Sequence, residues 1–232
     1  MKKHLILAFG TILALAAASG LQAYSYNAWG TMTGARTLAV NPFFWGSLKG
    51  GAGLTVDAVL LYGFTPRFDV IADIAEVNIA PTAGYALSYL MPRFDLGKNN
   101  ILALQLTAAN SSPASFSITP QYHFFAENGR LAIEFNAGLT IPFSDLDGSS
   151  LYAVIAPVLK IAPGSLHLFL EVDPSYSAFD GSGASALNLV PGVWIGLAGG
   201  RHQFSFGVPL GGVTSGSVGV GYALWYWTTF SL

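Results

Sequence analysis

The chain has 232 residues, of which 52% are hydrophobic and only 9% are charged, and its formal net charge at pH 7 is -2. A soluble domain usually carries about 25% charged residues, so the composition argues against a soluble protein. The small net charge gives no case for nucleic-acid binding, and the lack of cysteine excludes a disulfide framework and any cysteine-based metal or redox site.

Residues 1–23 are predicted to be a secretory signal peptide. Lys2 and Lys3 give a basic start, an apolar run follows over 5–18, and Leu21-Gln22-Ala23 ends on a small residue. We place cleavage after Ala23, which leaves residues 24–232 as one domain. A membrane anchor is the alternative, but about 14 apolar residues are few for a spanning helix.

Residues 24–50 are ambiguous. Alternation over 24–31 allows a first strand, and 38–44 offers a second candidate that contains Pro42, which is unfavourable within a sheet. This region could be a strand, a plug or a periplasmic tail. Farther along, every apolar run is interrupted by glycine, proline or polar residues before it reaches about 18 residues, so helical spans are excluded.

From residue 53 onward apolar and polar residues alternate with a period of two, which only a β-strand converts into two faces. The predicted strands are 53–64, 68–78, 83–91, 100–107, 116–124, 131–139, 151–161, 165–173, 187–198, 201–210 and 216–232. With one strand from 24–44 they make twelve, the even number typical of bacterial single-chain barrels. We therefore predict an all-β, antiparallel, up-and-down transmembrane barrel of twelve strands, with ten as the alternative, because closure satisfies the backbone in lipid.

The connections predict the orientation of the barrel. Thr65-Pro66-Arg67, Asn128-Gly129, Pro163-Gly164 and Gly199-Gly200 are short and should be periplasmic, whereas 141–150 and 175–185 are longer and should lie outside.

The Asn128-Gly129 turn also predicts how its two strands pair. A two-residue turn at Asn128-Gly129 should set His123 opposite Glu134 and Gln121 opposite Asn136.

Several aromatic residues are expected on the lipid side. In strand 83–91 the outward residues should be Tyr85, Leu87, Tyr89 and Met91. An aromatic girdle near the periplasmic rim should include Tyr62, Phe64, Phe68, Phe124, Tyr226 and Phe230.

The last stretch, 216–232, alternates apolar and aromatic residues with small or polar ones. It resembles the C-terminal closing strand of Gram-negative outer-membrane β-barrels, although it ends on Leu232 rather than on an aromatic residue. The resemblance implies a porin-like protein of the outer membrane, surrounded by outer-membrane lipid and inserted by the barrel-assembly machinery through this strand. Asn41-Pro42-Phe43 resembles the Asn-Pro box near the start of fatty-acid-transporter barrels, and a turn is the other interpretation.

The inward faces of the predicted strands should line a pore. Their polar members are Asp57, Asp69, Asp73, Gln105, Gln121, His123, Glu134, Asn136, Lys160, Glu171, Asp173 and Gln203. Asp57 and Asp73 should be diagonal neighbours, and two close carboxylates favour a bound cation or the neutral form of one of them. The general polarity of a barrel interior explains them as well, so we predict neither a metal site nor a cofactor. The acidic excess predicts a preference for cations.

Four aromatic residues, Phe169, Trp194, Trp225 and Trp227, should also point inward. They could fill the barrel, or they could form an apolar surface for a ligand.

The function predicted from these features is passive diffusion of small solutes with a mild cation preference. We predict no enzyme, because the one plausible base–orienter pair, His123 with Glu134, has no serine in register. One alternative is a non-conducting structural or surface-interaction barrel. The other is a carrier of an apolar ligand in the manner of the FadL fatty-acid transporter.

Overall fold

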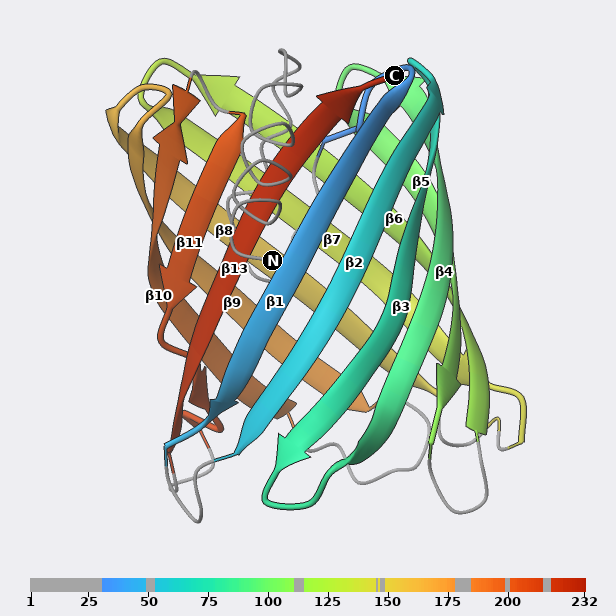
Figure 1. Cartoon of the computed structure of the whole chain (residues 1–232). Coiled ribbons are helices and arrows are strands. Elements are labelled where there is room, and N and C mark those ends of the chain that lie inside the picture. The colour runs from blue at the N-terminus through green and yellow to red at the C-terminus, as the bar shows by residue number, and fades with distance from the viewer. Residues whose placement is uncertain are drawn as a thin grey trace, which may run out of the picture.

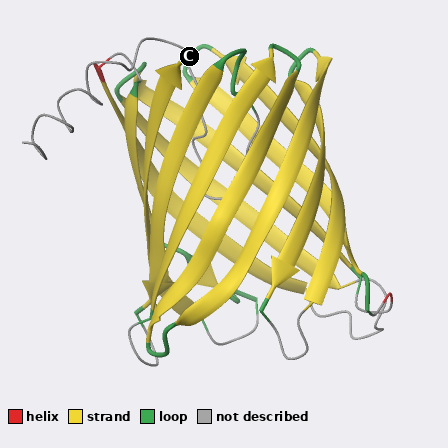
Figure 2. Ribbon diagram, turned by 45° about the vertical axis from the view of Figure 1, so that its right-hand side comes forward, coloured by secondary structure: helices red, strands yellow, loops and turns green. Residues whose placement is uncertain are grey.

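The structure is a computed structural model, and it describes residues 31–48, 53–110, 115–144, 146, 149–177, 185–198, 201–214 and 218–232. Strands are the elements that build it (Figures 1 and 2). Their bounds are β1 (Thr37–Ser47), β2 (Leu54–Thr65), β3 (Phe68–Ala80), β4 (Gly84–Gly97), β5 (Asn100–Ala109), β6 (Ser115–Asn128), β7 (Leu131–Pro142), β8 (Ser150–Ala162), β9 (Leu166–Ser177), β10 (Ser185–Leu197), β11 (His202–Gly207), β12 (Leu210–Gly211) and β13 (Gly219–Ser231). Within these ranges the structure has no helix long and apolar enough to cross a membrane.

From β1 to β11 each strand pairs antiparallel with the next one in the chain, and β13 pairs with both β11 and β1, so the sheet closes on itself. The short β11 and β12 both lie between β10 and β13. They are therefore two parts of one strand that is interrupted at Val208 and Pro209. The result is a closed up-and-down barrel of twelve strands, as the sequence predicts.

Strand β1 confirms the second of the two early candidates, since Leu38–Phe44 lies inside it. Pro42 is tolerated because it pairs with Ala58 of β2, while the ladder to β13 is broken between Val40 and Phe43. The interpretation of Asn41-Pro42 as a turn is therefore wrong. The signal peptide, the strand candidate before Thr31 and the Gly199-Gly200 turn lie outside the described residues.

Side chains alternate between the interior and the outside of the barrel. Along β8, buried Val154, Ala156 and Val158 alternate with exposed Ile155 and Leu159. Outward positions stay apolar around the barrel, as shown by Leu104, Phe116, Ile133, Leu168, Ile195, Phe206 and Leu224. A soluble sandwich needs a polar outer face, whereas this belt is suited to lipid.

Tight turns gather at one end of the barrel, which we call the turn end, and longer connections lie at the other (Figure 1). The first and last barrel residues, Thr37 and Ser231, pair with each other at the turn end. An outward row of stacked rings marks this end, with centroids 5.5 Å apart for Phe64 and Phe68 and 4.8 Å apart for Phe68 and Phe94. This row matches part of the predicted aromatic girdle.

The register predicted for the β6–β7 hairpin is wrong. Asn128 pairs with Leu131, so Gly129, with φ of 60°, and Arg130 form the turn. His123 consequently lies opposite Asn136 rather than Glu134, and Gln121 lies opposite Gly138. The error is two residues along the ladder, which leaves every side chain on its predicted face.

The prediction for β4 is wrong in length and in the facing of Tyr89 and Met91, whereas Tyr85 is exposed as predicted. The strand continues beyond residue 91 through Pro92 and Arg93 to Gly97. Met91 is buried opposite buried Ile71, and Tyr89 packs against the interior cluster, whereas Leu90 is exposed. Apart from Ser88, both faces of this strand are apolar before Arg93, so alternation there gives little information about which face is inward.

The exposed apolar belt predicts that the cost of an outward charged side chain depends on its depth in the membrane. Ile155→Arg, in the middle of β8, should reduce the free energy of folding into lipid vesicles by about 2–4 kcal/mol. Leu131→Arg is the control at the turn end and should cost only about 0–1 kcal/mol. Urea unfolding in vesicles measures both, and equal losses would contradict the assignment of this surface to lipid.

Candidate functional site

The interior of the barrel is the candidate site. Every polar residue predicted to line it lies on the inward side of its strand, and all are buried except Gln105 and Asp173, which are half-buried. The four aromatic residues predicted to point inward are buried as well. The interior therefore combines a polar part and an apolar part, which the next paragraphs describe separately.

A chain of hydrogen bonds follows β5 and β6. Gln121 Nε2 donates to Gln105 Oε1 at 2.6 Å, and Gln105 Nε2 donates to Thr107 Oγ1 at 2.9 Å. His123 Nε2 lies 2.8 Å from Gln121 Oε1. The histidine predicted to be oriented by Glu134 is thus hydrogen-bonded to the side-chain amide of Gln121. Such linked amides give a polar wall that is fixed in position rather than mobile.

An ion pair that the sequence did not reveal lies near the turn end. Arg93 Nε and Nη2 donate to the two carboxylate oxygens of Asp69 at 2.8 and 2.7 Å, and both side chains are fully buried. Arg93 escaped prediction because the strand was ended before Pro92. The signal was present, since β3 and β4 place Asp69 and Arg93 directly opposite each other.

The same pair holds the segment that precedes β1 against the inner wall. Arg93 Nη2 donates to the Thr31 carbonyl at 2.9 Å, and the Thr33 amide donates to Asp69 Oδ2 at 2.7 Å. The segment then passes Gly63 so closely that a Cβ there would lie 1.6 Å from the Gly34 carbonyl oxygen. Residues 31–34 are therefore built into the interior near the turn end.

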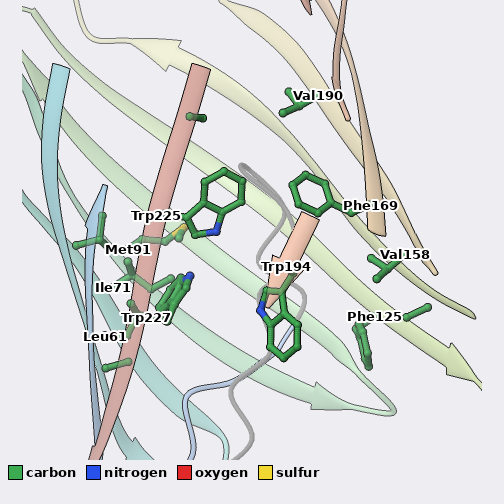
Figure 3. Close-up of a cluster of buried hydrophobic side chains, with 14 of the residues drawn as sticks. Leu61, Ile71, Met91, Phe125, Val158, Phe169, Val190, Trp194, Trp225 and Trp227 are labelled. Atoms are coloured by element: carbon green, nitrogen blue, oxygen red, sulfur yellow. The ribbon is translucent and has the colours of Figure 1, made fainter. Parts of the chain in front are cut away.

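The apolar part of the interior contains side chains from strands far apart in the sequence. Trp225 of β13 lies 5.7 Å, ring centre to ring centre, from both Phe43 of β1 and Phe169 of β9. Figure 3 shows Trp225, Phe169, Trp194 and Trp227 among the other buried apolar residues. Phe169 lies flat across the wall because its partner is Gly192, where a Cβ would lie 2.1 Å from the ring.

One of these aromatic residues is also tied to polar groups. Trp194 stacks on His167, with centroids 4.4 Å apart and planes inclined by 14°. Its Nε1 donates to Gln203 Oε1 at 3.2 Å. Trp194 is thus held in one orientation at the border between the two parts of the interior.

The charge of the interior is strongly unequal. The inward carboxylates of the described residues are Asp57, Asp69, Asp73, Glu76, Asp95, Glu127, Glu134, Glu171 and Asp173, and the inward basic groups on the described strands are Arg93 and Lys160. Arg93 is paired with Asp69, and Lys160 pairs with Glu127 at the turn end. Asp57 and Asp73 are diagonal neighbours, as predicted, because Asp73 pairs with Val59. Glu76 joins them although it was not predicted.

Comparison with known proteins identifies the fold but no family. No protein-family model and no curated protein matches the chain. Among solved structures it is similar to the COG4313 outer membrane channel from Pseudomonas putida F1, with a TM-score of 0.57 and 12% identity over 90% of this chain and 100% of that one. A loop-deletion mutant of OmpT, an outer membrane protein of Vibrio cholerae, aligns over 84% of this chain and 98% of that one, with a TM-score of 0.38 and 9% identity.

The chain therefore has the fold of outer-membrane β-barrels.

The buried ion pair predicts a measurable contribution to stability. Asp69→Asn leaves the Arg93 guanidinium buried without its carboxylate, so unfolding in urea should become easier by about 3–5 kcal/mol. Asp69→Asn combined with Arg93→Met removes both charges and should lose less than Asp69→Asn alone. A double variant that is the less stable of the two would contradict this account of the pair.

Proposed function

We propose that the protein is an outer-membrane channel for the passive diffusion of small solutes, with a mild preference for cations. The observation that carries the proposal is the unequal charge of the interior. Both interior basic groups of the described strands have an acidic partner, whereas the carboxylates outnumber them. A pore lined in this way lowers the energy of a passing cation and raises that of an anion.

The proposal includes a location and an orientation. The exposed apolar belt and the outward aromatic row favour insertion into a bilayer, and export would use residues 1–23 as a cleaved signal peptide. Strand β13, which closes the barrel against β1, would be the segment that the assembly machinery receives. The turn end would face the periplasm, as tight turns do in such barrels.

We further propose that the protein is not an enzyme. His123 lies opposite Asn136 and its Nε2 is hydrogen-bonded to Gln121, so this ring nitrogen is already engaged by a side-chain amide and is poorly placed to accept a proton from a substrate.

A second candidate function is retention of an apolar ligand. The observation in its favour is the buried cluster that includes Phe169, Trp194, Trp225 and Trp227, to which almost every strand contributes. A greasy molecule could displace part of these contacts and gain apolar burial in return.

Conductance of the refolded protein in a planar bilayer tests the first candidate. We expect steady single-channel steps and, under a KCl gradient, a reversal potential of the sign that denotes cation preference. Glu171→Gln with Asp173→Asn should move the reversal potential toward zero, because two interior charges are lost. Arg67→Gln, which removes an exposed charge at the β2–β3 turn, is the control and should change little. A folded barrel without steps, or one that prefers anions, would refute the proposal.

Retention of radiolabelled palmitate by the detergent-solubilised barrel tests the second candidate. Phe169→Ala should reduce the bound fraction, because it removes an inward aromatic ring that packs against Trp225 and lies over Gly192. Leu170→Ala removes an outward side chain from the same strand and should leave retention unchanged. Equal retention by both variants would assign the label to the detergent belt.

A further inference from the structure

Three carboxylates from two strands meet inside the barrel. Asp57 lies on β2, Asp73 and Glu76 lie on β3, and one oxygen from each lies within 4.8 Å of the others. Asp57 and Asp73 are 7% and 3% exposed, and Glu76 is half-buried. We call these three residues the acidic triad.

A β-bulge brings the third carboxylate into this group. Between the pairs Val56↔Val77 and Val59↔Asp73, β2 has two residues and β3 has three, so β3 carries one extra residue. An extra residue reverses the alternation of the strand beyond it. Odd-numbered residues such as Asp69 and Asp73 face inward before the bulge, and even-numbered residues face inward after it.

The residues beyond the bulge confirm this reversal. Asn78 Oδ1 accepts a hydrogen bond from the inward hydroxyl of Thr55 at 2.9 Å, and Ile79 is 49% exposed on the lipid side. Without the bulge Glu76 would point toward lipid, where a carboxylate is costly. Bulges that re-aim one side chain are frequent beside functional sites.

Three of the six carboxylate oxygens of the triad are buried without a hydrogen-bond partner among the described residues. Neither oxygen of Asp73, nor Oδ1 of Asp57, accepts a hydrogen bond of normal geometry from the described residues, and their near neighbours are each other and the Ala58 and Ala75 amides. Asp69, four residues earlier on the same strand, is equally buried but meets Arg93 and the Thr33 amide. Buried carboxylates are normally paired with a cation or a donor, so the triad calls for a positive partner.

We propose that the acidic triad binds a hard divalent cation, Ca²⁺ in the first place. All its ligand atoms are carboxylate oxygens, which suit Ca²⁺ and Mg²⁺ rather than softer metals. Two oxygens bound to one Ca²⁺ at about 2.4 Å can be at most about 4.8 Å apart, which agrees with the spacing of the triad. The prediction from sequence that the interior holds no metal is replaced by this proposal.

The chemistry of the triad favours Ca²⁺ over Mg²⁺. The three carboxylates offer both oxygens each, close to the about 6–8 oxygen ligands that Ca²⁺ takes in irregular geometry. Mg²⁺ demands a near-octahedral arrangement and gives up its water reluctantly. A bound cation would link β2 to the bulged part of β3. This role does not require the barrel to conduct.

Calcium titration of the refolded, chelator-treated protein tests the proposal directly. Isothermal titration with CaCl₂ in detergent at fixed ionic strength should show one saturable site. Asp73→Asn and Glu76→Gln should each weaken binding at least tenfold, because each removes a charged ligand. Asp95→Asn is the matched control, since it removes one carboxylate from the neighbouring strand outside the triad, and its affinity should equal that of the unmodified protein.

Thermal unfolding supplies a second readout with a definite sign. In EDTA, Asp73→Asn should raise the unfolding temperature, because it relieves repulsion within the triad. In CaCl₂ the unmodified protein should gain stability and Asp73→Asn should not. Absence of saturable calcium binding, or equal binding by Asp73→Asn and the unmodified protein, would overturn the proposal. Conductance is not measured here, so either result leaves the channel function to its own test.

Discussion

The structure depends on one constraint, which is that a backbone in hydrocarbon must satisfy its own hydrogen bonds. Pairing of β1 with β13 meets that constraint by leaving the sheet without a free edge. Closure then fixes the rest. It divides every strand into a lipid face and an interior face, it makes the outer face apolar, and it leaves the charged residues of the described strands in the interior or at the strand ends.

The interior shows two ways of accommodating a buried carboxylate. Asp69 is neutralised by Arg93 and also holds the segment before β1 through Thr33. Asp73 has no such partner among the described residues, and the bulge in β3 adds Glu76 to its surroundings. The first arrangement stabilises the barrel with protein groups alone, whereas the second concentrates charge that a solute or a bound cation must balance.

The sequence was sufficient for the fold and for most of the interior, because a period of two decides facing without knowledge of the partner strand. Prediction from the sequence failed where a proline or an extra residue interrupts the alternation of a strand. Arg93 was missed because the strand was predicted to end before Pro92, and Glu76 was missed because the extra residue in β3 reverses the faces of the strand. The β6–β7 turn was predicted at Asn128 and Gly129, but it is formed by Gly129 and Arg130. The Asn-Gly pair marks a turn without deciding whether Gly129 is its first or its second residue, and the pairing of the whole strands decides this.

Closure itself is the central claim, and the natural lack of cysteine allows a clean test of it. Leu38 of β1 pairs with Phe230 of β13, and both side chains face outward. Leu38→Cys with Phe230→Cys should cross-link in the refolded protein under mild oxidation, because directly paired residues bring their Cβ atoms within about 5.5 Å. Leu38→Cys with Leu224→Cys, six residues out of register, should not. Failure of the first pair, or equal cross-linking of both, would contradict a closed barrel with this register.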